Sequence, residues 1–320
     1  MILGQDRAVD QFLAAWQKRR LHHAWLLAGP RGVGKATFSR AAASRVLADA
    51  AGPVRGDGLS VPDDHSVMRL IAAGSHPDFR FVERLERPTG GLARNISVAQ
   101  IRGLGDMLAV TPSISPWRAI VIDAADDLEA SAANALLKML EEPPANTLFF
   151  LVAHAPGRLL PTIRSRCRRL DFDTLGDDAM TSLLSHQFPD KNPAQIRAAA
   201  GLAGGSAGRA QRAATLDLAS LEQAALTIMT EGDPTNARRS ALAGQLSGKA
   251  SAERYAAFLD LVPSLIAREA RNFDAARRNR AIHAYGKARE TASLAPRLTL
   301  DPGMTVFHLG SILADLALKR

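Results

Sequence analysis

The stretch GPRGVGKATF, residues 29–38, constrains this chain more than any other segment. Glycine, four residues, glycine and lysine form the pattern of a phosphate-binding loop. The sequence predicts a buried strand before it, over 23–29, and a helix after it, over 35–51. In that setting the backbone N–H groups of the loop converge at a helix N-terminus, where they bind anions. The sequence therefore predicts an α/β domain with a phosphate site at the edge of its sheet.

Position 36 departs from this pattern. Serine or threonine usually stands there, and its hydroxyl holds Mg²⁺ beside the nucleotide, whereas this chain has Ala36. Thr37 lies one residue further along the helix, about 100° around its axis, so it is no substitute. Binding of ATP or ADP stays open, Mg²⁺ coordination is in doubt, and a glycine turn that binds nothing is the alternative. The predicted nucleotide-binding residues are Gly29, Pro30, Arg31, Gly32, Val33, Gly34, Lys35, Ala36, Thr37 and Asp123.

A second buried strand, predicted within 117–128, ends in acidic residues. Asp123 is placed to hold the shell of a metal ion through water. The next residue is Ala124, where ring-forming ATPases of this kind commonly have a glutamate that polarises the attacking water. Asp126 and Asp127 are expected to begin the following helix. Because alanine occupies two catalytic positions, 36 and 124, the sequence argues against ATP hydrolysis.

Strands and helices alternate through the first half of the chain. Further strands are predicted over 78–85 and 147–154, and helices over 97–108, with Ser97 as the cap, and 131–142. The stretch 52–75 is rich in Gly, Pro and Asp and is expected to be irregular. Alternation of this kind indicates a parallel sheet with its ligand at the carboxyl edge of the strands.

After about residue 172 the sequence predicts helices alone, with breaks at 203–210 and 231–236. We therefore expect an α/β domain over 1–172, a small helical lid domain over 173–216 and a helical C-terminal domain over 217–320.

The overall composition indicates in which compartment the protein is found and which kind of partner it binds. Forty Lys and Arg against 32 Asp and Glu give a net charge of +8, which favours an acidic partner, nucleic acid first. The single cysteine, Cys167, excludes an internal disulfide and is expected to be a small buried residue rather than a nucleophile. Neither an export signal nor a run of about 18 apolar residues is found, so we expect a cytoplasmic protein.

Arginines gather in IRSRCRR, residues 163–169. Surface arginines are usually solvated charges, but an arginine displayed from a loop can also reach the γ-phosphate bound by a neighbouring subunit. The histidines have no metal-ligand spacing, and His65 with its neighbouring aspartates is a poor metal site.

Several segments together resemble the bacterial clamp-loader family, the AAA+ proteins of the DNA polymerase III holoenzyme. They are GQDRAV, LHHAWLLAGPRGVGKATFSR, HPDF, ISVAQIR, IDAADDLEASAANALLKMLEEPP and LLPTIRSRC. The resemblance is close over 1–172 and loose over the remainder. It implies an AAA+ P-loop domain, a helical lid and a helical collar domain that joins the subunits of a five-membered ring.

Within that family the chain resembles the delta-prime branch rather than the ATP-hydrolysing gamma/tau branch. Ala153-His154 replace the paired threonines of the motor subunits, and their lid arginine falls at Gly208. The resemblance implies that Arg166, within the motif Ser165-Arg166-Cys167, acts as an arginine finger in trans while Ser165 and Cys167 are structural. No zinc is expected, because 52–75 lacks the four cysteines of the zinc module that many clamp-loader subunits carry.

The partners implied are the gamma/tau and delta subunits, the sliding clamp, and primed DNA through the assembled complex. We do not expect the chain to be an ATPase by itself. Two alternatives stay open at this point: an active gamma/tau-like clamp-loader ATPase, and a stand-alone AAA+ DNA remodelling ATPase.

Overall fold

The computed structural model of the protein describes residue 2, residues 4–87 and residues 91–317. Contacts group the chain into two compact units. The first is Met1–Met180 with Gly205–Gly208, and the second is Thr181–Gly204 with Arg209–Arg320. The division into three domains at residues 172 and 216 stays a prediction.

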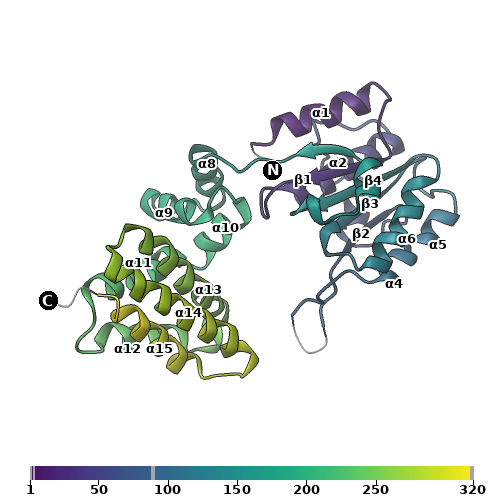
Figure 1. Ribbon diagram of the computed structural model, residues 1–320. Coiled ribbons are helices and arrows are strands. Elements are labelled where there is room, and N and C mark those ends of the chain that lie inside the picture. The colour runs from purple at the N-terminus through teal and green to yellow at the C-terminus, as the bar shows by residue number, and fades with distance from the viewer. Residues whose placement is uncertain (1, 3, 88–90, 318–320) are drawn as a thin grey trace. The chain divides into compact units, whose positions relative to one another are not determined.

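The first unit is built on a five-stranded parallel sheet in the order β2-β3-β4-β1-β5 (Figure 1). The central strands β1 and β4 are buried along their whole length, as expected of a sheet with helices on both faces. The predicted α/β architecture is confirmed. The strands are β1 (Ala24–Ala28), β2 (Phe79–Glu83), β3 (Arg118–Asp123), β4 (Thr147–Ala153) and β5 (Arg168–Asp171).

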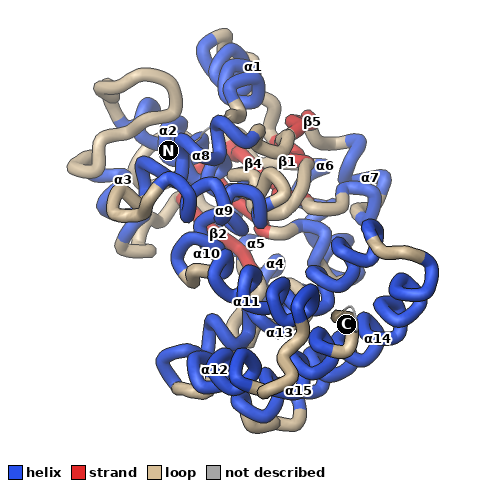
Figure 2. The backbone as a smooth tube through the Cα atoms, turned by 90° about the vertical axis from the view of Figure 1, so that its left-hand side faces the viewer, coloured by secondary structure: helices blue, strands red, loops and turns tan. Residues whose placement is uncertain are grey.

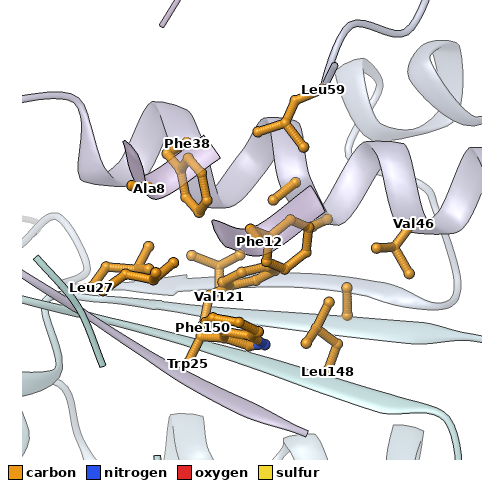
Figure 3. Close-up of a cluster of buried hydrophobic side chains, with 14 of the residues drawn as sticks. Ala8, Phe12, Trp25, Leu27, Phe38, Val46, Leu59, Val121, Leu148 and Phe150 are labelled. Carbon is orange, nitrogen blue, oxygen red and sulfur yellow. The ribbon is translucent and has the colours of Figure 1, made fainter. Parts of the chain in front are cut away.

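Successive residues of each strand point to opposite faces of the sheet, and each face has its own hydrophobic cluster. On one face the rings of Phe12, Trp25, Phe38 and Phe150 pack edge to face or tilted, with centroids 5.3 to 6.4 Å apart (Figure 3). On the other face Leu26, the strand neighbour of Trp25, packs with residues of α4 and α6. Burial on both faces fixes the register of the strands and thus the positions of the loops that follow them.

The helices of the first unit follow the predicted alternation. Ser97 caps its helix as predicted, in a reciprocal arrangement with Gln100. The helices are α1 (Asp6–Gln17), α2 (Lys35–Ala51), α3 (Ser66–Ala72), α4 (Val98–Arg102), α5 (Leu104–Ala109), α6 (Ala130–Glu141) and α7 (Pro161–Ser165), with 3-10 turns η1 (Ala125–Asp127) and η2 (Pro156–Arg158).

Four local predictions were wrong. The segment 52–75 contains α3, whose first turn is capped by the His65 ring. The helix predicted over 97–108 is two helices that meet at Gly103. Residues 168–171, for which the sequence predicted no strand, form the edge strand β5. Asp126 and Asp127 lie in η1 and not in α6, which begins three residues later at Ala130.

Among the described residues of the second unit, helices joined by loops are present and strands are not (Figure 2). Its core gathers apolar residues of α11 to α15 around Phe258 and Leu309, both fully buried. Both predicted breaks are present, because α9 ends at Ala203 and α11 ends at Glu231. The first is shorter than the predicted 203–210, since α10 begins at Ala207. The remaining helices are α8 (Asp177–Gln187), which crosses the boundary between the units, α9 (Pro193–Ala203), α10 (Ala207–Thr215), α11 (Leu218–Glu231), α12 (Ala237–Leu246), α13 (Ala252–Glu269), α14 (Ala275–Arg297) and α15 (Pro302–Ala314), with turns η3 (Lys249–Ser251) and η4 (Ala270–Asn272).

Candidate nucleotide site and arginine edge

The glycine loop leaves the carboxyl end of β1 and turns directly into α2. Gly34 is the N-cap of α2 and has a φ of 100°, a left-handed conformation that favours glycine. The N-terminus of a 17-residue helix therefore faces the loop, with the unpaired N–H groups and positive dipole end that bind phosphate. The backbone therefore has the strand, glycine turn and helix that the sequence predicted, while phosphate binding stays a prediction.

Lys35 is buried under this loop, with 3% of its surface exposed. Its ammonium group donates to the carbonyl oxygens of Gly29 and Pro30, each at 2.5 Å. Burial lowers the pKa of Lys35 to about 8, and the nearby Asp123 and Asp126 carboxylates partly oppose that shift. An ammonium has three donors, so one remains for a phosphate oxygen while two stiffen the loop.

The loop is braced from two other segments of the same unit. The Gln5 side-chain amide donates to the Val33 carbonyl at 3.2 Å. The Gly208 N–H donates to the Gly32 carbonyl at 3.0 Å, and a Cβ added at Gly32 would lie 2.2 Å from the buried Ser206 hydroxyl oxygen. The sequence pattern of 203–210 predicts a helix break, and the family resemblance places the lid arginine of the motor subunits at Gly208. The contact of Gly208 with Gly32 itself follows from neither.

Asp123 ends β3 beside Glu83 of β2, with which it pairs in register. Burial, followed by the Glu83 charge, raises the pKa of Asp123, and Lys35 opposes the shift. Ala36 follows Lys35 with no oxygen on its side chain, and the Thr37 side chain is exposed to solvent. The donor set therefore fits phosphate groups but lacks the hydroxyl that usually completes a Mg²⁺ site.

The carboxylates of Asp126 and Asp127 contact backbone N–H groups and arginines of the same chain. The Asp126 carboxylate accepts the backbone N–H groups of His154 at 3.0 Å and Ala155 at 2.9 Å. The Asp127 carboxylate pairs with Arg31 at 3.5 Å and Arg84 at 3.3 Å. Neither acid replaces the glutamate that is missing at Ala124, which is itself buried.

His154 follows β4 and faces the same group of charges. Burial and the neighbouring Lys35 lower the pKa of His154 to about 4, while Asp126 opposes the shift. Its buried Nδ1 has no hydrogen-bond partner among the described residues. The sequence gave His154 no metal-ligand spacing, and its place beside Lys35 follows only from the order of the strands.

Arg166 lies at the other end of the sheet, between α7 and β5. Its Nη2 pairs with a Glu141 carboxylate oxygen of α6 at 2.8 Å, and its Nη1 donates to the Thr162 carbonyl at 3.0 Å. The Ser165 hydroxyl donates to the same carbonyl at 3.0 Å. The Cys167 side chain is half-buried, and burial raises the pKa of its thiol to about 12, so the thiol stays protonated and packs as an apolar group.

The sheet register separates Arg166 from the glycine loop. Arg168, two residues after Arg166, pairs with Trp25, which lies four residues before Gly29. At a rise of about 3.3 Å per residue, Arg168 lies roughly 13 Å along the strand direction from the level of Gly29. The structure thus brings the glycine loop, Asp123 and His154 together at the carboxyl edge of the sheet, where the strands end. Ser165, Arg166 and Cys167 lie at the amino edge, where the strands begin.

The described residues hold no group of three His, Cys, Asp or Glu side chains arranged to bind a metal ion. No described helix combines the length and apolar character that a membrane-spanning helix needs. That the chain binds no zinc stays a prediction.

Comparison with known sequences decides the family. The sequence model described as "DNA polymerase III, delta subunit" matches residues 4–176, more than half of the chain. The chain belongs to this family. The predicted resemblance to the delta-prime branch of the clamp loaders is confirmed by its curated relatives.

Two of those relatives are delta' subunits of DNA polymerase III. The protein of Pseudomonas aeruginosa is 34% identical over 192 residues, 59% of this chain and 55% of the relative. That of Bacillus subtilis is 34% identical over 194 residues, 61% of this chain and 55% of the relative. A gamma subunit from Buchnera aphidicola is 32% identical over 187 residues, 58% of this chain and 47% of the relative. The chain thus spans about half the length of the curated relatives that it matches.

Among solved structures, a DNA polymerase III gamma subunit-related protein of Thermotoga maritima aligns over 96% of this chain and 99% of its own. Its TM-score is 0.47 and its sequence identity is 16%.

Proposed function

We propose that this chain is a delta-prime-like subunit of the DNA polymerase III clamp loader. In this proposal it assembles with gamma/tau and delta subunits in the cytoplasm and helps to load the sliding clamp on primed DNA. It binds nucleotide phosphates without hydrolysing ATP, and it supplies Arg166 to the ATP site of a neighbouring subunit. The delta', gamma and tau subunits among its relatives support this assignment.

The carboxyl edge of the sheet supports binding without turnover. The α2 N-terminus and Lys35 would hold the phosphates of ATP or ADP, which supply the anion for this site. The two side chains that hydrolysis would add are absent, because Ala36 brings no metal ligand and Ala124 brings no carboxylate. The acids nearest to Ala124 are already engaged by backbone N–H groups and arginines.

The position of Arg166 carries the proposal for action in trans. Its side chain is 35% exposed and lies at the sheet edge opposite to the glycine loop of its own chain. An arginine there cannot reach phosphates that its own loop binds, yet it is open to a second subunit. A guanidinium keeps its charge and can contact two phosphate oxygens at once, which suits it to neutralise charge during phosphoryl transfer.

Reconstitution tests the proposal. The chain, as wild type or Arg166→Ala, is assembled with gamma/tau and delta subunits, and DNA-stimulated ATP hydrolysis and clamp loading are measured. We expect the Arg166→Ala chain to assemble into the complex. The ATP site that Arg166 completes should then no longer contribute to ATP hydrolysis. Arginine fingers supplied in trans contribute roughly 10³–10⁵-fold in well-studied hydrolases, and the remaining sites of the complex make the overall loss smaller.

Arg168→Ala and Arg169→Ala are the matched controls. Arg168 lies over the Trp25 ring and Arg169 pairs with Asp171 of its own strand, so both are engaged within β5 and its neighbour. Normal clamp loading by an assembled Arg166→Ala complex would refute the role in trans.

A further inference from the structure

The Arg166 side chain is held by two groups of its own chain, one on each of two helices. Glu141 is the last residue of α6, and its carboxylate meets Nη2 at 2.8 Å. Thr162 lies in α7, and its carbonyl accepts from Nη1 at 3.0 Å. Since α6 packs against α7, the guanidinium is fixed across the junction of the two helices.

This arrangement leaves most of the guanidinium available. Arginine has five N–H donors in a rigid plane, and the two contacts use one donor on Nη1 and one on Nη2. The Nε–H and one N–H on each terminal nitrogen remain for the oxygens of a bound phosphate. The Glu141 contact is therefore compatible with phosphate binding.

The ion pair is too exposed to serve mainly as a brace of the fold. The side chains of Arg166 and Glu141 are 35% and 42% exposed, and ion pairs at such surfaces contribute little to stability. The neighbouring Glu142 has the same charge but no ion pair among the described residues. A contact of this kind matters more for where the arginine points than for whether the chain folds.

We infer that Glu141 is a positioning residue for Arg166, holding the guanidinium in the orientation in which it meets the triphosphate bound by a neighbouring subunit. The inference rests on the proposed function of Arg166 in trans. A long side chain that is ordered before assembly loses less conformational entropy when it meets its ligand. Removing the Glu141 charge leaves the finger in place but disorders it, which lowers the rate of phosphoryl transfer rather than the affinity for ATP.

The test is a double-mutant cycle in the reconstituted complex with gamma/tau and delta subunits, sliding clamp and primed DNA. The variants are Glu141→Gln, Arg166→Ala and the two together, with Glu142→Gln as the matched control. Gel filtration confirms that each complex assembles, and kcat and KM of DNA-stimulated ATP hydrolysis are measured. We expect Glu141→Gln to lower the turnover of the one ATP site that Arg166 completes about two- to fivefold, as loss of a surface ion pair would. The kcat of the whole complex should therefore fall by less than it does in Arg166→Ala, with KM unchanged. Glu142→Gln should have no effect, and Glu141→Gln should have none once Arg166 is alanine.

The outcomes separate the inference from the function on which it rests. If Arg166→Ala turns over at the wild-type rate, the role of Arg166 in trans is wrong. If Arg166→Ala is slow but Glu141→Gln is as fast as wild type, or faster, Glu141 does not position the finger. A Glu141→Gln defect that persists in the Arg166→Ala background, or that Glu142→Gln shares, also overturns the inference.

Discussion

The two edges of the five-stranded sheet carry charged groups in opposite ways. At the carboxyl edge Lys35 is 3% exposed and His154 is half-buried, and burial lowers the pKa of both groups. At the amino edge the Arg166 side chain is 35% exposed and pairs with a Glu141 side chain that is 42% exposed. The charged groups at the carboxyl edge are therefore buried in the fold, whereas Arg166 at the amino edge is partly exposed to solvent.

In the proposed function, this difference separates a site for the chain's own ligand from a group that acts on a ligand of another subunit. Desolvated charges strengthen interactions with a bound anion but are costly to the empty fold. An exposed arginine costs the fold little and gains its function only when a partner covers it.

At the amino edge, Cys167 directly follows Arg166 in the sequence. Because burial raises the thiol pKa from 9.0 to about 12, the native thiol should hold about 10³-fold less thiolate than the unfolded chain at pH 8. We expect iodoacetamide to label native Cys167 at least a hundredfold more slowly than the urea-unfolded protein. Similar labelling rates in the two states would show that this position is open to solvent.

At the carboxyl edge, Lys35 should make stability rise with alkaline pH. Its native pKa is about 8 against 10.5 unfolded, so between these values the unfolded chain binds more protons and the free energy of unfolding increases with pH. The gain is at most roughly 3 kcal/mol. Urea unfolding followed by tryptophan fluorescence reports this unit, because the three tryptophans, Trp16, Trp25 and Trp117, all lie in it.

Lys35→Met should abolish that alkaline gain. Comparing it with wild type cancels the opposite contribution of Cys167 above pH 9, where the native thiol keeps its proton. Equal pH slopes in the two proteins would mean that Lys35 is not desolvated.

His154 should act on stability at acid pH with a slope of the same sign as that of Lys35. Its native pKa is about 4 against 6.5 unfolded, so the unfolded chain gains a proton first as pH falls, and the fold loses stability between pH 6.5 and 4. The groups that face it are Lys35, Arg31, Asp126 and Asp127. We expect His154→Gln to remove about 2 kcal/mol of this loss, since the ring is only half-buried. If the free energy of unfolding of His154→Gln fell as much as that of wild type between pH 6.5 and 4, this would contradict the burial of the ring.

The smallest effect is expected for Arg166→Ala in the isolated chain. Its ion pair is exposed on both sides, so the free energy of unfolding should change by less than about 0.5 kcal/mol. Tryptophan fluorescence in urea measures this too. A loss of several kcal/mol would make Arg166 a structural residue and remove the contrast between the edges.

Most of the first unit could be predicted from the sequence because its signals are local. Buried strands, the glycine loop and the Ser97 cap each follow from residues next to one another. The strand β5 was missed because its four residues, RRLD, carry three charges. An edge strand can be polar and still pair with its neighbour. Leu170 is the one apolar residue of this strand, and it is buried.

The site was predictable where it follows a motif and hidden where it depends on distant contacts. Lys35 and Asp123 could be named from the loop and from the strand that ends in acids. The contact of Gly208 with Gly32, 176 positions away in the sequence, and that of Glu141 with Arg166 have no such signal. They depend on which elements the fold brings together.

In the proposed function, the chain contributes to ATP hydrolysis through Arg166 and not through its own glycine loop. The most direct test compares two reconstituted complexes, one carrying Lys35→Ala and the other Arg166→Ala, in DNA-stimulated ATP hydrolysis. We predict that the Lys35→Ala complex keeps its rate within about twofold, while the Arg166→Ala complex loses the contribution of the neighbouring site. The reverse result would be a slow Lys35→Ala complex and an unaffected Arg166→Ala complex. It would show that the chain is itself a motor subunit and would contradict the proposed function.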